Sequence, residues 1–535
     1  MSEALFAPAK QRAAVPSSER PPDRRTLVPD AVTSPKTNVI PIRSPEPGPV
    51  QVDILEDVDF LSGSSFTAPT VLSQGQWVSL GLTATLLATG LVVAPTITLV
   101  AINAGLLLFF MAANCMKLLL IDRSLRGGAQ SGSRGSPERI LQQDLPVYTI
   151  LLPVYREVSV LRQLVAGIKD LDYPNTLLDV KLLLEEDDTE MLAAVEAMTL
   201  PRCFDVLVVP DIGQRGKPRA CNYGLARAKG EYLVIFDAED RPEPDQLRKA
   251  VAAFRRHVPN VVCYQAKLNY FNRRHNLLTR WFTSEYSVWF DQFLPGLQSL
   301  DVAIPLGGTS NHFITERLRR LGGWNPFNVT EDAELGVRIY LRSWKTAILD
   351  STTYEEATSQ YHNWIRQRSR WVKGYMQTYL WSMRHPIRFA RRTGLKPFAS
   401  FQLFFGANTL CLLINAAYWV MVALWFVTRA SWIPSLFPGP VFYFAVVGLL
   451  IGNGACVVSI VSGSIARRHY EDVKWAFLVP VYWILMSIAA YKALFQLIHK
   501  PSYWEKTDHG ICQYESTSPI IAMDSYSQRQ EASWR

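Results

Sequence analysis

The chain has 535 residues, of which 48% are hydrophobic and 19% charged, with a net charge of +8. It is too apolar for an ordinary soluble enzyme and too charged for a bundle of membrane helices alone, so a mixed protein is expected. Its basic residues lie among long apolar spans, as in the positive-inside bias of membrane proteins, which argues against nucleic acid as a partner. Seven scattered cysteines show no zinc-site spacing and disfavour disulfides, which fits a cytosolic domain.

Two segments have compositions that do not support a packed core. Residues 1 to about 70 are rich in Pro, Ser, Arg and Asp and lack an apolar period that would offset the entropy of ordering. A disordered cytosolic tail is predicted there, and its start lacks the layout of a signal peptide. Residues 127–139, GGAQSGSRGSPER, have the Gly and Ser content of a flexible linker.

Between these segments, residues 77–121 carry almost no charge before Lys117. The stretch is about twice as long as one bilayer crossing needs, and Pro95 lies near its middle. It predicts a hairpin of two N-terminal transmembrane helices. Because basic residues follow the second helix, the chain from residue 122 onward is expected in the cytoplasm.

From residue 146 short apolar strands alternate with helical stretches. PVYTILLPVYRE, VKLLLEEDD and FDVLVVPD read as buried strands, and the pattern predicts an α/β domain. A fourth strand, in GEYLVIFDAEDR, ends in Asp237, Glu239 and Asp240. Acids at the end of a buried strand suit a divalent cation beside a substrate pyrophosphate. An acidic helix start is the alternative, because PEPDQLRKAVAAF opens a helix directly afterwards.

Two motifs follow this cluster. Residues 330–332, TED, precede AELGVRIYL and also make a good helix N-terminus. In QRSRW, the residues Gln367, Arg370 and Trp371 lie at i, i+3 and i+4 and share one helical face. Arginine can neutralise charge on a departing diphosphate, and tryptophan offers an apolar face to a sugar ring. The alternative for QRSRW is an amphipathic helix at a membrane surface.

The C-terminal part, 401–498, holds three apolar stretches. Those at 401–427 and 441–461 have the length and lack of charge of spans, and the basic loop after the second should face the cytoplasm. The third, 475–498, contains Pro480 and Lys492. It either crosses the membrane or lies at the interface as an amphipathic helix.

Taken together, LLPVYRE, GKPRACNYG, DAED, TED and QRSRW resemble motifs of the membrane-embedded, processive family 2 glycosyltransferases of the cellulose, hyaluronan and chitin synthase type. The resemblance covers about 146–375 and implies a GT-A type fold, Rossmann-like with a mixed sheet, with interface helices to about 395. It implies an inverting enzyme that moves a sugar from a UDP-sugar, glucose favoured, to a growing β-linked polysaccharide. Mg²⁺ or Mn²⁺ is the implied cofactor.

The same resemblance implies roles for individual residues. Asp332 is the general base, with Glu331 beside it, and Asp237 acts in catalysis and as a metal ligand. The family pattern is Asp-x-Asp, whereas this chain has Glu239 in the second position and Asp240 after it; both are metal candidates. The implied substrate-binding residues are Pro153, Tyr155, Glu157, Glu186 (with Asp187 beside it), Lys217, Asn222, Gln367, Arg370 and Trp371.

Two further segments share the resemblance. GGTSNHF, at 307–313, resembles the family's acceptor-end loop, and Trp504, Lys506 and Thr507 resemble its gating loop. The expected location is the inner membrane, multi-pass, with the catalytic domain in the cytoplasm. The expected partners are the UDP-sugar, a polysaccharide acceptor, the lipid bilayer and export proteins of the periplasm or outer membrane.

Two alternatives remain open. The first is a transferase that adds a single sugar to a lipid carrier, against which QxxRW argues. The second is a non-catalytic membrane receptor or assembly protein with a degenerate transferase domain, against which the intact TED and QxxRW argue. None of these motifs specifies the sugar or its linkage.

Overall fold

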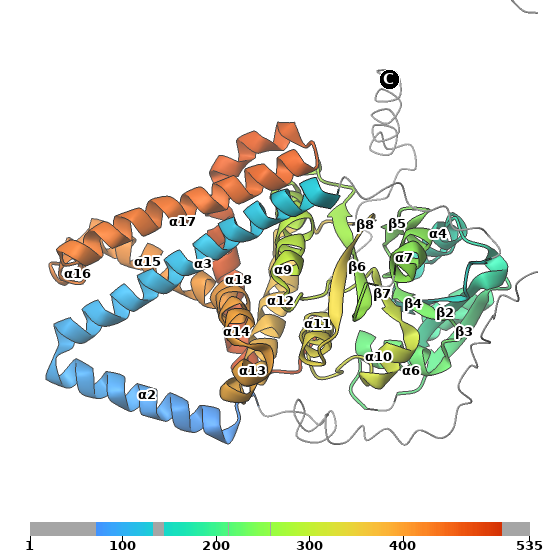
Figure 1. Ribbon diagram of the computed structural model, residues 1–535, viewed down its shortest axis with the longest axis horizontal. Coiled ribbons are helices and arrows are strands. Elements are labelled where there is room, and N and C mark those ends of the chain that lie inside the picture. The colour runs from blue at the N-terminus through green and yellow to red at the C-terminus, as the bar shows by residue number, and fades with distance from the viewer. Residues whose placement is uncertain (1–70, 132–143, 212, 257, 506–535) are drawn as a thin grey trace, which may run out of the picture. The chain divides into compact units, whose positions relative to one another are not determined.

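The computed structural model describes residues 71–131, 144–211, 213–256 and 258–505 (Figure 1). The predicted tail over 1–70, residues 132–139 of the predicted linker, and Lys506 and Thr507 lie outside these ranges.

A mixed sheet forms the centre of the α/β domain (Figure 1). Its strands are β1 (Tyr148–Val154), β2 (Leu178–Glu185), β3 (Phe204–Val209), β4 (Tyr232–Ile235), β5 (Arg241–Pro242), β6 (Val261–Tyr270), β7 (Asn311–Ile314) and β8 (Lys345–Glu355). They lie in the order β3-β2-β1-β4-β7-β6-β8-β5. The first four in that order are parallel, β7 runs antiparallel between β4 and β6, β8 is parallel to β6, and β5 is antiparallel to β8.

Helices cover both faces of the sheet, which is why almost every residue of β1 and β2 is buried, on both faces rather than on alternate positions. Ile150 and Leu152 pack into a core with α4 (Val158–Lys169), α5 (Thr189–Glu196) and α7 (Gln246–Arg255). Leu151 points to the opposite core, formed with α6 (Lys217–Arg227), α10 (Thr315–Arg320) and α11 (Glu331–Leu341). This is the α/β mixed sheet of the predicted fold class, and the prediction is confirmed.

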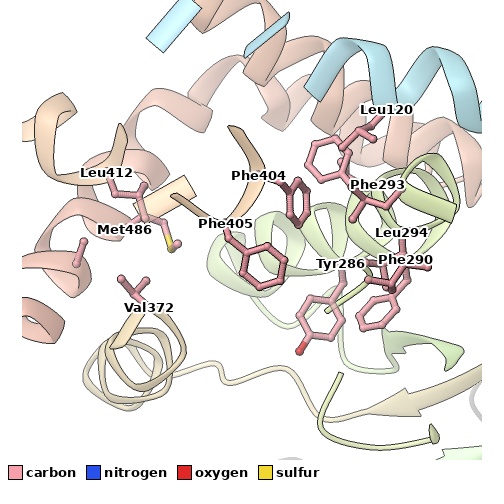
Figure 2. Packing of buried hydrophobic residues seen from close by; sticks show 14 of the residues in the cluster. Leu120, Tyr286, Phe290, Phe293, Leu294, Val372, Phe404, Phe405, Leu412 and Met486 are labelled. Atoms are coloured by element: carbon pink, nitrogen blue, oxygen red, sulfur yellow. The ribbon is translucent and has the colours of Figure 1, made fainter. Parts of the chain in front are cut away.

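A third apolar core joins this domain to the apolar helices. Tyr286, Phe290 and Phe293 lie close to Phe404 and Phe405, and Leu412 and Met486 continue the cluster (Figure 2). The elements that contribute are α8 (Leu277–Val288), the π-helical turn η3 (Trp289–Phe293), α9 (Leu294–Leu300), α12 (Tyr361–Ser382), α13 (Pro386–Thr393), α14 (Leu395–Phe401) and the helices that follow.

Within the described residues, five helical segments are long and apolar enough to cross a membrane. They are α2 (Gln74–Val93); α3 (Pro95–Ser131); α14 with η4 (Gln402–Gly406) and α15 (Ala407–Thr428); α17 (Gly439–Ala466); and η5 (Tyr470–Leu478) with α18 (Val479–His499). Short helical turns η2 (Asn175–Leu177) and α16 (Trp432–Ser435) complete the described elements.

Two expectations about these helices can be compared with the structure. The helix α3 continues to Ser131, so the first five residues of the predicted linker over 127–139 are helical rather than extended loop. The third C-terminal stretch, whose course the sequence left open, belongs to a segment with the length and hydropathy of a span.

Candidate active site

A cavity of about 680 Å³ runs from the sheet edge into the apolar helices. At the sheet edge it is lined by residues that follow β1, β2 and β4, among them Tyr155, Asp187 and Asp237. These strands are parallel, so their carboxyl ends meet at one edge, the place where open α/β sheets bind ligands. The cavity therefore lies where the sequence predicted the site.

The acids after β2 divide into different roles. Glu185 forms a buried ion pair with Arg219, and Asp187 pairs with Arg215 at 3.0 Å; both acids line the cavity. Asp188 caps α5 by accepting from the Met191 N–H at 3.3 Å. Glu186, predicted to bind substrate, is exposed and accepts from the Asp211 N–H at 3.1 Å, away from the cavity wall.

The residues after β1 lie on the cavity wall as predicted. Pro153 and Glu157 line it, and Tyr155 donates from its hydroxyl to Asp187 at 3.4 Å. Asp187 thus links the ends of β1 and β2 and, unlike Glu186, lines the cavity.

Lys217 connects the basic helix α6 to the acidic strand end. Its Nζ donates to the Asp237 carboxylate and to the Gly308 carbonyl oxygen at 2.7 Å. Burial alone would lower the pKa of Lys217, but Asp237 and nearby acids raise it above its ordinary value, so the side chain stays charged. A fixed cation therefore faces the acids of DAED.

The three acids of DAED occupy different environments. Asp237 and Glu239 line the cavity, whereas Asp240 is buried and accepts from the Asp237 N–H at 2.7 Å and from the Thr309 hydroxyl. Burial, then the charges of Asp237 and Glu239, raise the pKa of Asp240 well above its usual range. In the described residues no three His, Cys, Asp or Glu side chains are arranged as a metal cage. Two cavity-facing carboxylates are nevertheless what Mg²⁺ commonly takes from protein when phosphates and water complete its shell.

A fourth acid joins this cluster without having been predicted. Glu355, the last residue of β8, lines the cavity. Burial and then the charges of Asp240, Glu239 and Asp237 raise its pKa well above the ordinary value. Glu355 reaches the cavity because β8 pairs with β6, a strand that is distant in sequence. The only local sign of it in the sequence was an acid at the end of a strand.

The TED motif lies on the same cavity at the start of α11. Asp332 Oδ1 accepts from the Ala333 N–H at 2.7 Å, and Glu331 and Asp332 both line the wall. A Cβ added to Gly308 would lie 3.6 Å from Asp332 Oδ2 and 3.8 Å from Lys217 Nζ, so the GGT loop brings TED next to the acidic strand end. Burial raises the pKa of Asp332 to about 6, although its backbone hydrogen bonds, Lys217 and Arg370 act in the opposite direction.

The QRSRW motif lies on α12, close to TED. A Cβ on Gly374 would lie 2.2 Å from Thr330 Oγ1, so glycine permits this approach. Gln367 accepts from the Thr358 hydroxyl at 3.1 Å, Trp371 stacks on Tyr286 with centroids 5.9 Å apart, and both line the cavity with Arg370. The predicted helical face of the motif therefore meets the cavity.

The described C-terminal residues cover this helix. Lys373 Nζ donates to the Tyr503 carbonyl at 2.6 Å, and Arg370 Nη1 donates to the Glu505 carbonyl at 3.3 Å. The Arg370 guanidinium lies 4.8 Å from the Trp504 ring centroid, and Trp504 lines the cavity. Trp504, predicted as part of a gating segment, therefore lies over the site.

Two interacting residues, Glu285 and Tyr482, were not predicted from the sequence. Glu285 on α8 lines the cavity and pairs with Arg368, and the Tyr482 hydroxyl donates to the same carboxylate. Because Arg368 is one of the two variable residues of QxxRW, the motif also joins α12 to α18.

Asn222 was predicted to bind substrate, but its amide donates to the Trp324 carbonyl at 2.8 Å and it does not line the cavity.

Comparison with known proteins agrees with this geometry. The model of the glycosyltransferase-like family 2 matches residues 146–374. A probable glycosyltransferase, YdaM, of Bacillus subtilis (strain 168) is 24% identical over 62% of this chain and 83% of its own length. A beta-monoglucosyldiacylglycerol synthase of Nostoc sp. is 28% identical over 45% of this chain and 52% of its own. A probable glucomannan 4-beta-mannosyltransferase 7 of Oryza sativa subsp. japonica is 28% identical over 45% and 42%. The chain thus spans about half the length of the latter two relatives.

Among solved structures, the mannosyltransferase PcManGT of Pyrobaculum calidifontis, in complex with GDP-Man and Mn²⁺, is 18% identical over 74% of this chain and 99% of its own, with a TM-score of 0.42. At that score the likeness adds nothing to the argument from the sheet and the family match. The chain therefore carries, over residues 146–374, the catalytic domain of a family 2 glycosyltransferase, flanked by helices that fit embedding in a membrane.

Proposed function

We propose that the enzyme transfers a hexose from a UDP-sugar, glucose favoured, with inversion, to a growing β-linked polysaccharide that leaves through the apolar helices. The observation that carries this proposal is the continuity of the cavity. The same cavity is lined by Asp237 and Asp332 at one end and by Leu412, Ser459 and Met486 of the candidate spans at the other. An acceptor can therefore approach Asp332 from the membrane side while the donor occupies the sheet edge.

The donor end has the charges that a nucleoside diphosphate needs. Lys217 and Arg370 supply cations for the diphosphate oxygens, and such charge-assisted contacts are among the strongest hydrogen bonds. Asp237 and Glu239 would hold Mg²⁺ or Mn²⁺, which when bound neutralises charge on the leaving diphosphate. Asp240 supports the turn by binding the Asp237 N–H, so we assign it to positioning rather than to ligation.

Asp332 acts as the general base. Its carboxylate takes the proton of the acceptor hydroxyl as that oxygen attacks the anomeric carbon, while the bond from this carbon to the diphosphate oxygen breaks. Attack opposite the leaving group inverts the configuration. Arg370 balances the charge on the departing diphosphate, because its guanidinium lies near both TED and the acidic cluster. Glu331, whose pKa burial raises, lies beside Asp332 as an auxiliary acid.

The acceptor sugar next to the reacting hydroxyl has an aromatic neighbour. Trp371 lines the cavity and is held by its stacking on Tyr286. A held ring offers a flat apolar surface for a sugar at little entropic cost. We therefore place the non-reacting end of the acceptor against Trp371.

The proposed location is the inner membrane, with the catalytic domain in the cytoplasm. Arg123 and Arg126 lie in the last part of α3, and Arg467 and Arg468 follow α17, on the side of the catalytic domain. If a polysaccharide crosses there, proteins of the periplasm or outer membrane would receive it.

The second candidate is transfer of a single sugar to a lipid acceptor. The apolar wall formed by Leu412, Ile460 and Met486 favours it, because a lipid tail would fit such a lining better than a glycan. Two relatives are named as beta-monoglucosyldiacylglycerol synthases, a name that describes the addition of one glucose to a lipid.

Product analysis separates the two. Membranes containing the protein are incubated with each labelled nucleotide sugar in turn, UDP-glucose first and GDP-mannose included because two relatives are named as mannosyltransferases. Label in an insoluble or glycanase-sensitive polymer supports the polysaccharide proposal. Label only in mono-glycosylated lipid, extractable into organic solvent, contradicts it and favours the second candidate.

A further inference from the structure

At the membrane end of the cavity lies a lysine, Lys117, for which the described residues supply no counter-ion. Lys117 is on α3, inside the segment with the hydropathy of a span, and it lines the cavity. Its Nζ is 5.4 Å from the ring centroid of Trp483 on α18, which also lines the cavity. Two elements far apart in the sequence thus bring an ammonium group and an indole together.

Neither polar group has a partner within the described chain. Lys117 makes no ion pair or hydrogen bond with the residues that the structure describes, and the buried Trp483 Nε1–H has no acceptor there. A buried donor without an acceptor costs free energy, and ionisable residues in membrane segments usually mark a ligand site. Both groups are donors, so the missing ligand is an acceptor of hydrogen bonds, and the positive charge selects an anion.

The surroundings indicate which anion fits. Lys117 is five residues before Asp122, which corresponds to roughly 7 Å along a helix axis, so it lies near the end of the span next to the catalytic domain. The wall of the cavity in this region includes apolar side chains of the candidate spans, among them Leu412, Ile460 and Met486, together with the polar Asn408, Thr409 and Ser459. A charged group beside apolar surface at the end of a span matches an amphiphile with an anionic head.

We propose that Lys117 and Trp483 bind the phosphate of an anionic lipid, with its acyl chain against Leu412, Ile460 and Met486. The phosphate accepts hydrogen bonds from Lys117 Nζ and from Trp483 Nε1. The site opens into the part of the cavity where the proposed function places the acceptor. The lipid site itself does not depend on the proposed function; only the statement that it lies on the acceptor's route rests on that proposal. The lipid would set the width and charge of the passage between Asp332 and the spans.

The test uses the full-length protein in phosphatidylcholine nanodiscs doped with phosphatidylglycerol. Lipid retained after transfer to detergent is counted by native mass spectrometry, and its affinity is measured by titration. We expect the wild type to retain phosphatidylglycerol, and Lys117→Met to bind it at least about tenfold more weakly, as for the loss of a charge-assisted hydrogen bond. Lys117→Arg should retain it, and Trp483→Phe, which removes the N–H and keeps an aromatic ring, should weaken it less.

Lys474→Met is the matched control. Lys474 lies 5.2 Å from the Trp475 ring, a similar pairing, but it is exposed and does not line the cavity. It should retain phosphatidylglycerol as the wild type does. Equal retention by Lys117→Met and the wild type, or equal loss in Lys474→Met, would overturn the site.

Glycerol 3-phosphate, added as a competitor, distinguishes the source of the phosphate. If the ligand is a lipid, we expect glycerol 3-phosphate to displace little phosphatidylglycerol, because the acyl chain contributes to binding. Full displacement that depends on Lys117 would overturn the lipid assignment in favour of a soluble phosphate. UDP binding is measured on the same samples and should not change in Lys117→Met. A wild type that holds the lipid but transfers no sugar would refute the proposed function and leave this site standing.

Discussion

The two ends of the cavity differ in how their polar groups are satisfied. At the sheet edge, Lys217 is paired with Asp237, Arg219 with Glu185, and Arg215 with Asp187. At the membrane end, Lys117 and the Trp483 N–H have no partner in the described chain. Charges fixed before the donor arrives cost no reorganisation during the reaction, whereas the lipid proposed for the membrane end would supply the partners of Lys117 and Trp483 when it binds.

The difference follows from how each end is built. The donor end is formed by loops that follow strands and by helix starts anchored on one sheet, so its groups have little freedom. The membrane end takes its residues from four separate helices, α3, α15, α17 and α18, which only tertiary packing brings together. Substitutions at the donor end should therefore affect chemistry, and substitutions toward the membrane should affect acceptor use.

The largest effect is expected from replacing Asp332, the proposed general base at the donor end. Asp332→Asn should lower transfer by about 10²- to 10⁴-fold, the usual contribution of a general base, because the amide cannot take the acceptor proton. UDP affinity should remain, since Asp332 does not contact the nucleotide in the proposed role. Steady-state transfer and UDP titration measure the two. Asp350→Asn, at an exposed position outside the cavity, is the control, and near-normal transfer by Asp332→Asn would remove this residue from the mechanism.

Metal removal should produce the next largest effect. A chelator should reduce transfer by about a hundredfold, because charge on the leaving diphosphate is no longer neutralised. Added Mg²⁺ or Mn²⁺ should restore the wild type but not Asp237→Ala. Activity that persists in the chelator would mean that Asp237 and Glu239 serve only the ion pair with Lys217 and the turn.

The pH dependence sharpens the assignment of the base. Burial raises the pKa of Asp332 to about 6, and the base works only when deprotonated, so transfer should fall about tenfold per unit as pH drops below that value. Lys217 lowers this pKa, so its removal should move the acid limb to higher pH. The limb is read from kcat/KM in Lys217→Met and the wild type, and a limb that stays in place would separate Lys217 from Asp332.

The smallest effect is expected for Trp371, which lies between the two ends of the cavity. Trp371→Ala should weaken acceptor use by roughly fivefold, since an aromatic contact contributes on the order of 1 kcal/mol. Trp371→Phe should recover most of it, and UDP affinity should remain normal in both. Acceptor KM and product length are the measurements. A changed UDP affinity with normal acceptor KM would assign Trp371 to the donor.

The donor end was largely predictable from sequence because its residues are tied to local signals. Asp237 follows a buried strand, TED opens a helix, and Gln367, Arg370 and Trp371 share one helical face, so local patterns indicated the element of each and the family resemblance assigned each to the site. These residues meet the cavity in the structure. Their roles remain predictions until the variants are measured.

Residues placed by distant packing were not predictable in the same way. Glu355 reaches the cavity through the pairing of β8 with β6, and Glu285 and Lys117 through the contact of helices from different parts of the chain. Local motifs also pointed to side chains that the fold directs elsewhere. Asn222 binds the backbone at Trp324, and Glu186 binds that of Asp211.

The most direct test of the continuous route from Asp332 to the membrane uses sealed vesicles that contain only this protein, with the catalytic face outward. Labelled UDP-sugar is added outside, followed by a glycanase that cannot cross the membrane. We expect the labelled product to become resistant to the glycanase as it enters the lumen, and to become sensitive again when detergent opens the vesicles. A soluble product that stays outside, fully sensitive from the start, would contradict a route through the spans.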